Sequence, residues 1–215
     1  MFDLIISIKQ IPNGKWKENC YIISNINRDA LIIDPGSSEK IIITYIKENH
    51  LNASAILNTH SHYDHIGAIS KLKKEYSIPL FLHSKDEKLL KTANLYSNLF
   101  DGLGHLKIPT IDYYFDKINI KDYITYYQIR VLHTPGHTEG SVCLLIEDNL
   151  FTGDTLLNNR IGRVDLPGGD RNALIESLNI LSKFPHNINI YPGHGKPSTI
   201  GEQLKYNKEF IQILQ

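Results

Sequence analysis

The sequence predicts an α/β fold with two successive series of short strands and helices between and after them. Two observations carry this prediction: short apolar runs rich in β-branched residues recur along the chain, and segments with helical spacing of apolar residues separate them. A third observation concerns the turns. Several strands end in glycine-containing turns that carry histidine or aspartate, so the strands are expected to present polar side chains at their ends.

The first series of elements covers the amino-terminal half. We expect a helix at Ser38–Asn49, where a serine precedes the helically spaced Ile42, Tyr45 and Ile46. Two further helices are expected at Asp64–Tyr76 and Ser84–Leu99. The predicted strands are Leu4–Ile8, Tyr21–Ser24, Ala30–Ile33, Ala55–Leu57 and Leu80–Leu82.

The second series follows in the carboxy-terminal half. A helix is predicted at Arg171–Lys183, with Asp170 as its N-cap, and a terminal helix at Gly201–Leu214. The predicted strands are Ile129–Leu132, Val142–Ile146, Leu150–Phe151 and Ile188–Tyr191. No linker or low-complexity segment separates the two series in the sequence, so we expect one domain over residues 1–215.

Composition and charge limit the function classes. Lys plus Arg and Asp plus Glu are both 23, so the formal net charge is zero, which argues against nucleic acid or an anionic membrane as a partner. No run approaches the ~20 apolar residues of a membrane helix. The amino terminus does not read as a signal peptide, because Asp3 interrupts a short apolar stretch. We therefore expect a cytoplasmic protein that acts on a small molecule; the oligomeric state cannot be predicted from the sequence.

The two cysteines, Cys20 and Cys143, both lie in predicted strands. Buried thiols in a reducing compartment are the favoured interpretation, rather than a disulfide or a catalytic cysteine.

The most informative segment is residues 59–65, which hold three histidines and an aspartate directly after a predicted strand. His60 and His62 are two residues apart, so in extended backbone both side chains point to one face. Asp64 and His65 follow where the chain is expected to turn into a helix, and can address a second point close by. Imidazole and carboxylate are ligand types that zinc and iron use. The segment therefore predicts half of a two-metal site.

Three further residues of ligand type occur downstream, namely His137, Asp154 and His194. Each follows an apolar run and lies in a turn that contains glycine. Strands that end in such turns are a common way to present ligands to one shared cleft. The competing interpretation, polar turns without chemistry, does not explain why the pattern is repeated four times.

This pattern resembles the metallo-β-lactamase superfamily, most closely its glyoxalase II-like (hydroxyacylglutathione hydrolase-like) branch. The resemblance extends from Asn19-Cys20-Tyr21 to the final Pro-Gly-His-Gly motif around His194. It implies a four-layer αββα sandwich with the metals at the edge between the two sheets. It also implies a ligand set: His60, His62 and His137 for the first metal, Asp64, His65 and His194 for the second, and Asp154 as the bridge.

The resemblance implies a hydrolase with two Zn²⁺ per chain, Fe and Mn being the alternatives. A hydroxide bridging the two ions would attack a polarised carbonyl, so no protein nucleophile is required. Asp64 has an expected catalytic role besides ligation, in orienting the hydroxide or passing a proton to the leaving group. Because a thiolate leaves easily, the expected substrate is a small thioester of the S-2-hydroxyacylglutathione type.

The expected substrate-binding residue is Arg163, which lies shortly after Asp154 and could meet a substrate carboxylate. An ion pair with Asp165 or Asp170 is an equally good interpretation of this arginine. Full-length glyoxalase II enzymes carry an additional carboxy-terminal helical domain with basic glutathione contacts. Because one helix is predicted after His194, we expect this domain to be absent.

Other activities remain open. A persulfide dioxygenase would use the same fold with a single Fe(II) at His60, His137 and Asp154. A metal-dependent phosphodiesterase or RNA-processing nuclease would clamp a phosphodiester between two metals, but the neutral charge argues against it. A lactonase or β-lactamase is less favoured, because β-lactamases usually lack a histidine in the place of His65. The remaining histidines near the motifs, His83 and His133, are expected to have structural roles.

Overall fold

The structure is a computed structural model that describes residues 6–102 and 106–215. The chain forms two compact units. The first unit comprises Met1–Leu82 and Glu87–Tyr114, and the second comprises His83–Asp86 and Phe115–Gln215. Within the described ranges, none of the helices has both the length and the apolar character needed to cross a membrane.

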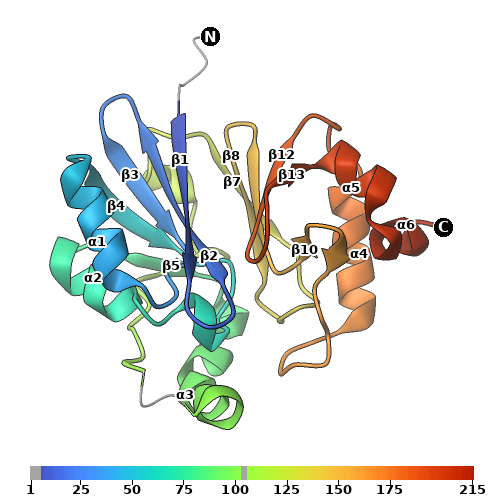
Figure 1. Cartoon of the computed structure of the whole chain (residues 1–215), viewed down its shortest axis with the longest axis horizontal. Coiled ribbons are helices and arrows are strands. Elements are labelled where there is room, and N and C mark those ends of the chain that lie inside the picture. The colour runs from blue at the N-terminus through green and yellow to red at the C-terminus, as the bar shows by residue number, and fades with distance from the viewer. Residues whose placement is uncertain (1–5, 103–105) are drawn as a thin grey trace. The chain divides into compact units, whose positions relative to one another are not determined.

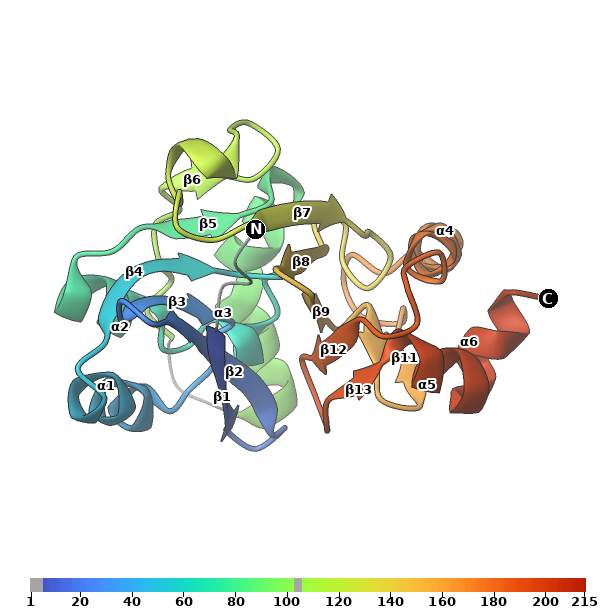
Figure 2. The same ribbon diagram turned by 90° about the horizontal axis from the view of Figure 1, so that it is seen from above.

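The first unit is built on a six-stranded sheet in the order β1-β2-β3-β4-β5-β6 (Figure 1 and Figure 2). The pairs β1–β2 and β2–β3 are antiparallel, and the remaining pairs are parallel. Pro12 lies in β1, an edge strand, where a missing N–H does not interrupt the sheet. The strands are β1 (Ile6–Asn13), β2 (Glu18–Asn25), β3 (Asp29–Ile33), β4 (Asn52–Leu57), β5 (Leu80–Leu82) and β6 (Tyr113–Tyr114).

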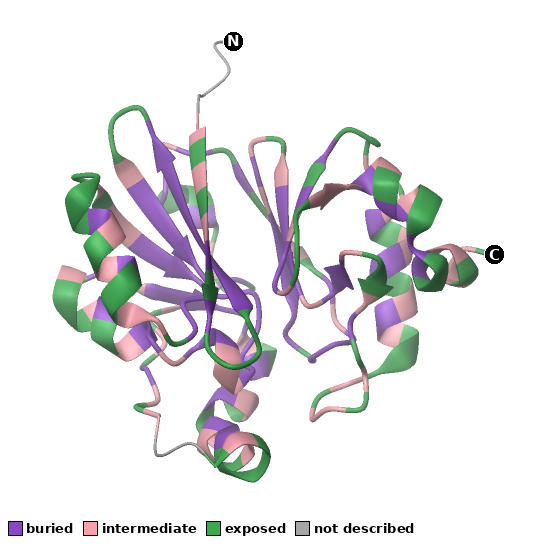
Figure 3. Ribbon diagram, viewed as in Figure 1, coloured by how far each residue is buried: buried purple, intermediate pink, exposed green. Residues whose placement is uncertain are grey.

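This sheet shares an apolar core with three helices of the first unit: α1 (Glu39–Glu48), α2 (Ile69–Tyr76) and α3 (Glu87–Asp101). A short 3-10 turn, η1 (Tyr63–His65), precedes α2. Strands β2 and β3 are buried along almost all of their length, whereas α1 and α2 alternate between buried and exposed faces (Figure 3). The shared apolar core includes Ile42 and Ile46 of α1, Ile69 and Leu72 of α2, Leu90 and Ala93 of α3, and Ile22, Ile32, Ile56 and Leu80 of the sheet.

The second unit is built on a five-stranded sheet in the order β13-β12-β9-β8-β7. The pair β12–β9 is parallel, and the other pairs are antiparallel. Its strands are β7 (Ile129–His133), β8 (Val142–Ile146), β9 (Asn149–Gly153), β12 (Asn189–Pro192) and β13 (Ser198–Thr199). A separate hairpin consists of β10 (Leu156–Leu157) and β11 (Arg160–Ile161).

The helices of the second unit are α4 (Arg171–Leu181), α5 (Ile200–Tyr206) and α6 (Lys208–Ile213), which lie together beside β12 and β13 (Figure 2). Two 3-10 turns, η2 (Ser84–Asp86) and η3 (Ile120–Asp122), complete this unit. The predicted N-cap is confirmed, because the Asp170 carboxylate accepts hydrogen bonds from the backbone N–H groups of Asn172 and Ala173. The core joins Leu174, Leu178 and Leu181 of α4, Ile200 of α5 and Phe210 of α6 to Cys143, Leu150 and Ile190 of the sheet.

The predicted helix at Asp64–Tyr76 is wrong in its first turn. The chain forms η1 there, and α2 begins only at Ile69. The backbone N–H of Ala68 donates to Pro35 O at 3.1 Å, and a Cβ on Gly67 would lie 2.5 Å from Gly36 O. This close approach to the turn after β3 holds the segment out of a continuous helix.

The predicted terminal helix is interrupted at Asn207, which separates α5 from α6. The Asn207 side chain accepts from Phe210 N and donates to Arg160 O at 3.0 Å, so it caps the last helix and ties it to β11. Most predicted strands are confirmed with small changes at their ends. Leu4 and Ile5, the first residues of the first predicted strand, lie outside the described residues.

Candidate metal centre

The first half of the predicted ligand set lies in the loop after β4. The rings of His60 and His62 are 4.9 Å apart and nearly perpendicular, and the ring of His65 lies 4.1 Å from that of His60. All three side chains are buried. The structure thus brings the three imidazoles of the loop into one cluster.

Asp34, at the end of β3, supports this loop. Its carboxylate accepts from Thr59 N at 2.6 Å and from the Thr59 hydroxyl at 2.5 Å. It also lies 3.1 Å from His65 Nδ1. A carboxylate only accepts, so the proton of a neutral His65 sits on Nδ1 and the lone pair is on Nε2. This is the arrangement by which an outer carboxylate orients a metal-binding histidine.

Two further contacts fix the same loop. The Asn58 amide donates to His60 O at 2.7 Å, and His60 Nδ1 lies 3.0 Å from the Thr59 hydroxyl. Asp64 is partly exposed, and its Oδ2 is 3.9 Å from His65 Nε2. The carboxylate of Asp64 therefore lies on the Nε2 side of His65, where a shared cation would be bound.

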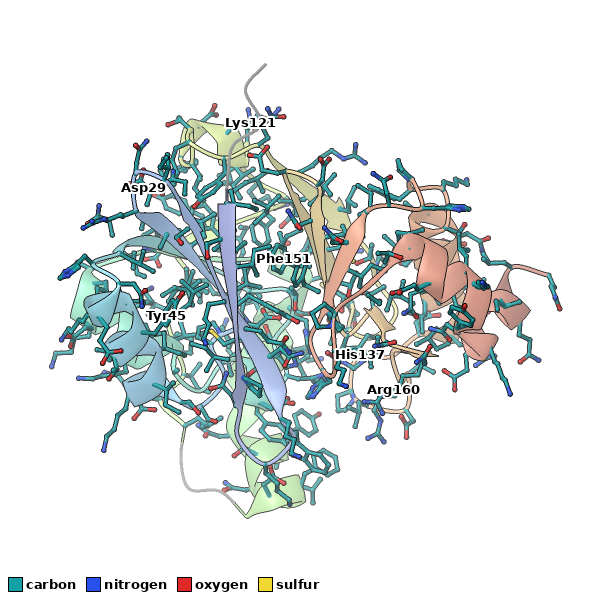
Figure 4. All side chains as sticks on the ribbon, turned by 45° about the horizontal axis from the view of Figure 1, so that its top comes forward. Asp29, Tyr45, Lys121, His137, Phe151 and Arg160 are labelled. Carbon is teal, nitrogen blue, oxygen red and sulfur yellow. The ribbon has the colours of Figure 1, made fainter. Side chains whose placement is uncertain are left out.

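The second half of the ligand set is assembled by the second sheet. His137 lies in the turn between β7 and β8 and is labelled in Figure 4. Its Nδ1 donates to Arg163 O at 2.8 Å, which leaves the Nε2 lone pair for a ligand bond. The turn is held by buried Asp86, which accepts from the Thr138 hydroxyl at 3.0 Å and from Gly140 N at 2.7 Å.

Asp154 follows β9 and is close to two histidines of this unit, His137 and His194. Its Oδ2 lies 3.6 Å from His137 Nε2 and 3.5 Å from His194 Nε2. Two ligands of a tetrahedral ion with bonds of roughly 2.1 Å lie about 3.4 Å apart. One carboxylate oxygen of Asp154 thus stands at ligand-to-ligand spacing from two imidazoles.

These residues fit a metal. Each half offers imidazole nitrogen and carboxylate oxygen, and histidines of both halves have their Nδ1 atoms engaged by hydrogen bonds. Such a donor set suits zinc, iron or manganese. The supporting roles of Asp34, Asn58 and Asp86 were not predicted from the sequence. A usable signal for Asp34 was its position in a Pro-Gly turn directly after a predicted strand.

Arg163 is paired with Asp165 in the structure. Its Nε and Nη2 donate to the two carboxylate oxygens of Asp165, both at 2.7 Å. The side-chain hydrogen bond to Arg163 lowers the pKa of Asp165 to about 2. The ion-pair interpretation of Arg163 is confirmed, and its contact with a substrate stays a prediction.

The structural roles expected for His133 and His83 are supported. Their rings stack 4.1 Å apart, and His133 Nε2 is hydrogen bonded to Glu139 O at 2.9 Å. Burial, followed by the charge of His133, lowers the pKa of His83 to about 4. His83 is therefore neutral at pH 7.

The two cysteines are buried, as predicted. Burial raises the pKa of both thiols, to about 12 for Cys143. Neither thiol is suited to act as a nucleophile near neutral pH, because the thiolate is the reactive form.

A family model described as the metallo-beta-lactamase superfamily matches residues 13–194. The chain belongs to this superfamily. The hydroxyacylglutathione hydrolase GloC of Haemophilus influenzae is 32% identical over 206 residues, covering 94% of this chain and 97% of that protein. Other similar proteins have coarser names, such as the probable metallo-hydrolase YqgX of Bacillus subtilis, 33% identical over 199 residues with 89% and 92% covered.

Solved structures confirm the fold of the superfamily. BLEG-1, described as a B3 metallo-beta-lactamase, has a TM-score of 0.87 and 35% identity, covering 94% of this chain and 98% of its own. TTHA1623, described in a di-iron-bound form, has a TM-score of 0.83 and 31% identity, covering 93% and 98%. The metallo-β-lactamase fold predicted from the motifs is thus established. Among the similar proteins named above, only GloC is named as a glyoxalase II-type enzyme, a hydroxyacylglutathione hydrolase.

Proposed function

We propose that this protein is a binuclear metal-dependent hydrolase that cleaves a small thioester of the S-2-hydroxyacylglutathione type in the cytoplasm. The observation that carries the proposal is the position of Asp154, whose Oδ2 is 3.6 Å and 3.5 Å from the Nε2 atoms of His137 and His194. A carboxylate oxygen at ligand spacing from two imidazoles is suited to being shared by two ions.

The proposed ligands follow the order of the superfamily motif. Asp154 is the shared ligand of the two ions. The first ion is assigned to His60, His62 and His137, and the second to Asp64, His65 and His194. The orientation of His65 by Asp34, and of His137 by Arg163 O, supports these assignments, because an occupied Nδ1 directs Nε2 toward the ion.

When bound, such ions lower the pKa of water to roughly 7 and polarise a carbonyl oxygen. The protein residues supply orientation and proton handling. The Asp64 carboxylate is partly exposed, so its oxygen can take a proton and release it toward a leaving thiolate. A thiolate needs little help from an acid, which favours a thioester over an amide or a phosphodiester.

The substrate class is supported by the 32% identity to hydroxyacylglutathione hydrolase GloC over nearly the whole length of both chains. The exposed Arg163–Asp165 pair provides a cation and an anion side by side, near the backbone carbonyl that holds His137. Such a pair suits a polar thiol carrier with both amino and carboxylate groups.

The test combines metal content with a substrate panel. The protein is produced with zinc, iron and manganese all supplied, and metals are counted per chain by mass spectrometry. Hydrolysis of S-lactoylglutathione is then compared with cleavage of bis(p-nitrophenyl) phosphate and with oxygen uptake on glutathione persulfide. Two ions per chain together with thioester hydrolysis above the other activities is the expected result. One iron per chain with oxygen uptake would overturn the proposal in favour of the dioxygenase.

A second candidate, β-lactam hydrolysis, is supported by the 35% identity to BLEG-1. The chromogenic cephalosporin nitrocefin belongs in the same panel for this reason. Nitrocefin turnover that exceeds thioester turnover in kcat/KM would replace the thioester as the substrate class, while leaving the two-metal centre in place.

A further inference from the structure

Glu18, the first residue of β2, has a buried carboxylate close to His65, one of the candidate metal ligands of the first unit. Only 1% of the residue is exposed. Its Oε1 lies 3.9 Å from His65 Nδ1, the same nitrogen that faces Asp34 at 3.1 Å. Two buried carboxylates therefore face the Nδ1 side of one imidazole.

The backbone makes room for this carboxylate at Gly36. A Cβ on Gly36 would lie 2.2 Å from Glu18 Oε2 and 2.2 Å from Asp64 O. Any larger residue would displace the Glu18 carboxylate or the backbone carbonyl of Asp64. The absence of a side chain at Gly36, in the turn after β3, therefore lets the Glu18 carboxylate and the backbone of Asp64 both lie close to this turn.

When both are ionised, the two carboxylates on the Nδ1 side of His65 place negative charge beside one imidazole. Buried negative charge is costly unless a positive group compensates it. A neutral imidazole supplies only a donor at Nδ1, whereas a divalent cation at Nε2 would supply net positive charge on the opposite side of the same ring. By this argument, the pair favours the cation-bound form of His65 over the empty one.

We propose that Glu18 is a positioning residue that, through His65 and beside Asp34, selectively strengthens the second metal position. This inference rests on the proposed function for the existence of two metal positions. Glu18 is not assigned as a ligand, and it need not touch substrate. Its effect is expected at the ion held by His65, and not at the ion assigned to His60 and His62.

The test is Glu18→Gln, which keeps the size of the side chain and removes its charge. Stepwise binding constants for Zn²⁺ are measured on metal-free full-length protein by calorimetry with a competing chelator. The variant His65→Ala identifies which binding step belongs to His65. The matched control is Glu48→Gln, which removes one negative charge at the exposed end of α1.

The expected result is that Glu18→Gln weakens the His65 step about tenfold and leaves the other step within twofold, while Glu48→Gln changes neither. An unchanged His65 step, or equal weakening of both steps, would overturn the assignment, since equal weakening indicates a general structural role. Circular dichroism of the metal-free variant checks that it is folded. Wild-type protein with a single binding step would instead count against the proposed two-metal function, so the two failures are distinguishable.

Discussion

The two units build their candidate ligands in different ways. In the first unit, four of them lie within residues 60–65, in one loop after β4. In the second unit, His137, Asp154 and His194 come from three separate turns, at the ends of β7, β9 and β12. The first arrangement depends on hydrogen bonds made by the side chains of Asp34 and Asn58, and the second depends on three turns being brought together by neighbouring strands.

Because of this difference, we expect single substitutions to disturb the candidate ligands of the two units differently. The loop of the first unit is held by hydrogen bonds to a few side chains, so single changes should affect single ligands. In the second unit, the Oδ2 atom of Asp154 lies within 3.6 Å of the Nε2 atoms of both candidate histidine ligands, His137 and His194. One change there should affect several ligands together.

The largest effect is expected for Asp154→Asn. Loss of the charge at the shared oxygen should lower thioester turnover by at least roughly 100-fold and reduce the metal content below two ions per chain. Turnover and metal content measured on the same preparation provide the check. A variant that keeps two ions and full turnover would remove Asp154 from its shared role.

The next largest effects are expected from alanine substitutions at two glycines, one in each unit. A Cβ on Gly162 would lie 2.0 Å from Asp154 O and 3.3 Å from His137 Cβ, while a Cβ on Gly36 would lie 2.2 Å from Asp64 O. Each alanine variant should lose about 1–3 kcal/mol of unfolding free energy, because the backbone must shift. Gly162→Ala should weaken binding of both ions, and Gly36→Ala mainly that of the second.

Urea denaturation and zinc titration of both alanine variants measure these effects. Gly201→Ala is the control, since its Cβ would be no closer than 3.1 Å to the side chain or backbone of His186. Equal zinc affinities in the two variants would show that the units do not differ in the way described.

A smaller effect concerns pH and the buried His83. Its pKa of about 4 in the folded protein lies below the ordinary value near 6.5, so the unfolded chain binds a proton more readily. The stability that neutral His83 provides is complete above about pH 6.5 and is lost as the pH falls toward 4. Urea midpoints of metal-free protein should therefore fall less steeply between pH 7 and 4.5 in His83→Gln. A slope identical to that of the wild type would contradict the assignment.

The smallest effect is expected at the helix caps. Asp170 accepts two backbone hydrogen bonds at the start of α4, whereas Ser38 makes no side-chain cap bond at the start of α1. Asp170→Ala should cost about 1 kcal/mol of unfolding free energy and Ser38→Ala close to none. Thermal melts of both variants test this, and a loss in Asp170→Ala as small as that expected for Ser38→Ala would contradict a stabilising role of the cap.

The fold and the ligand residue types could be predicted because their signals are local. His60 and His62 are only two residues apart in the sequence, and the strands are marked by apolar runs. The supports could not be predicted, since they depend on pairing between distant segments. Parallel pairing of Ile33 with Leu57 brings Asp34 beside Thr59, and no local sequence pattern predicts that contact.

Two predicted helices differ from the structure for the same reason. The helix predicted from Asp64 gives way to η1, because the segment contacts the turn at Pro35 and Gly36. The terminal helix is broken at Asn207, whose side chain bonds to Arg160 O across 47 residues of sequence. In both places the apolar residues have helical spacing, but a tertiary contact prevents a continuous helix.

The hydrogen bond from His137 to position 163 has a consequence for how such proteins diversify. The acceptor is the main-chain carbonyl, while the side chain of Arg163 points to Asp165. Replacing the side chain at this position leaves the carbonyl that orients the histidine in place. Under the proposed role of Arg163 in substrate binding, a substitution at residue 163 would change the side chain that meets the substrate and keep the carbonyl that orients His137.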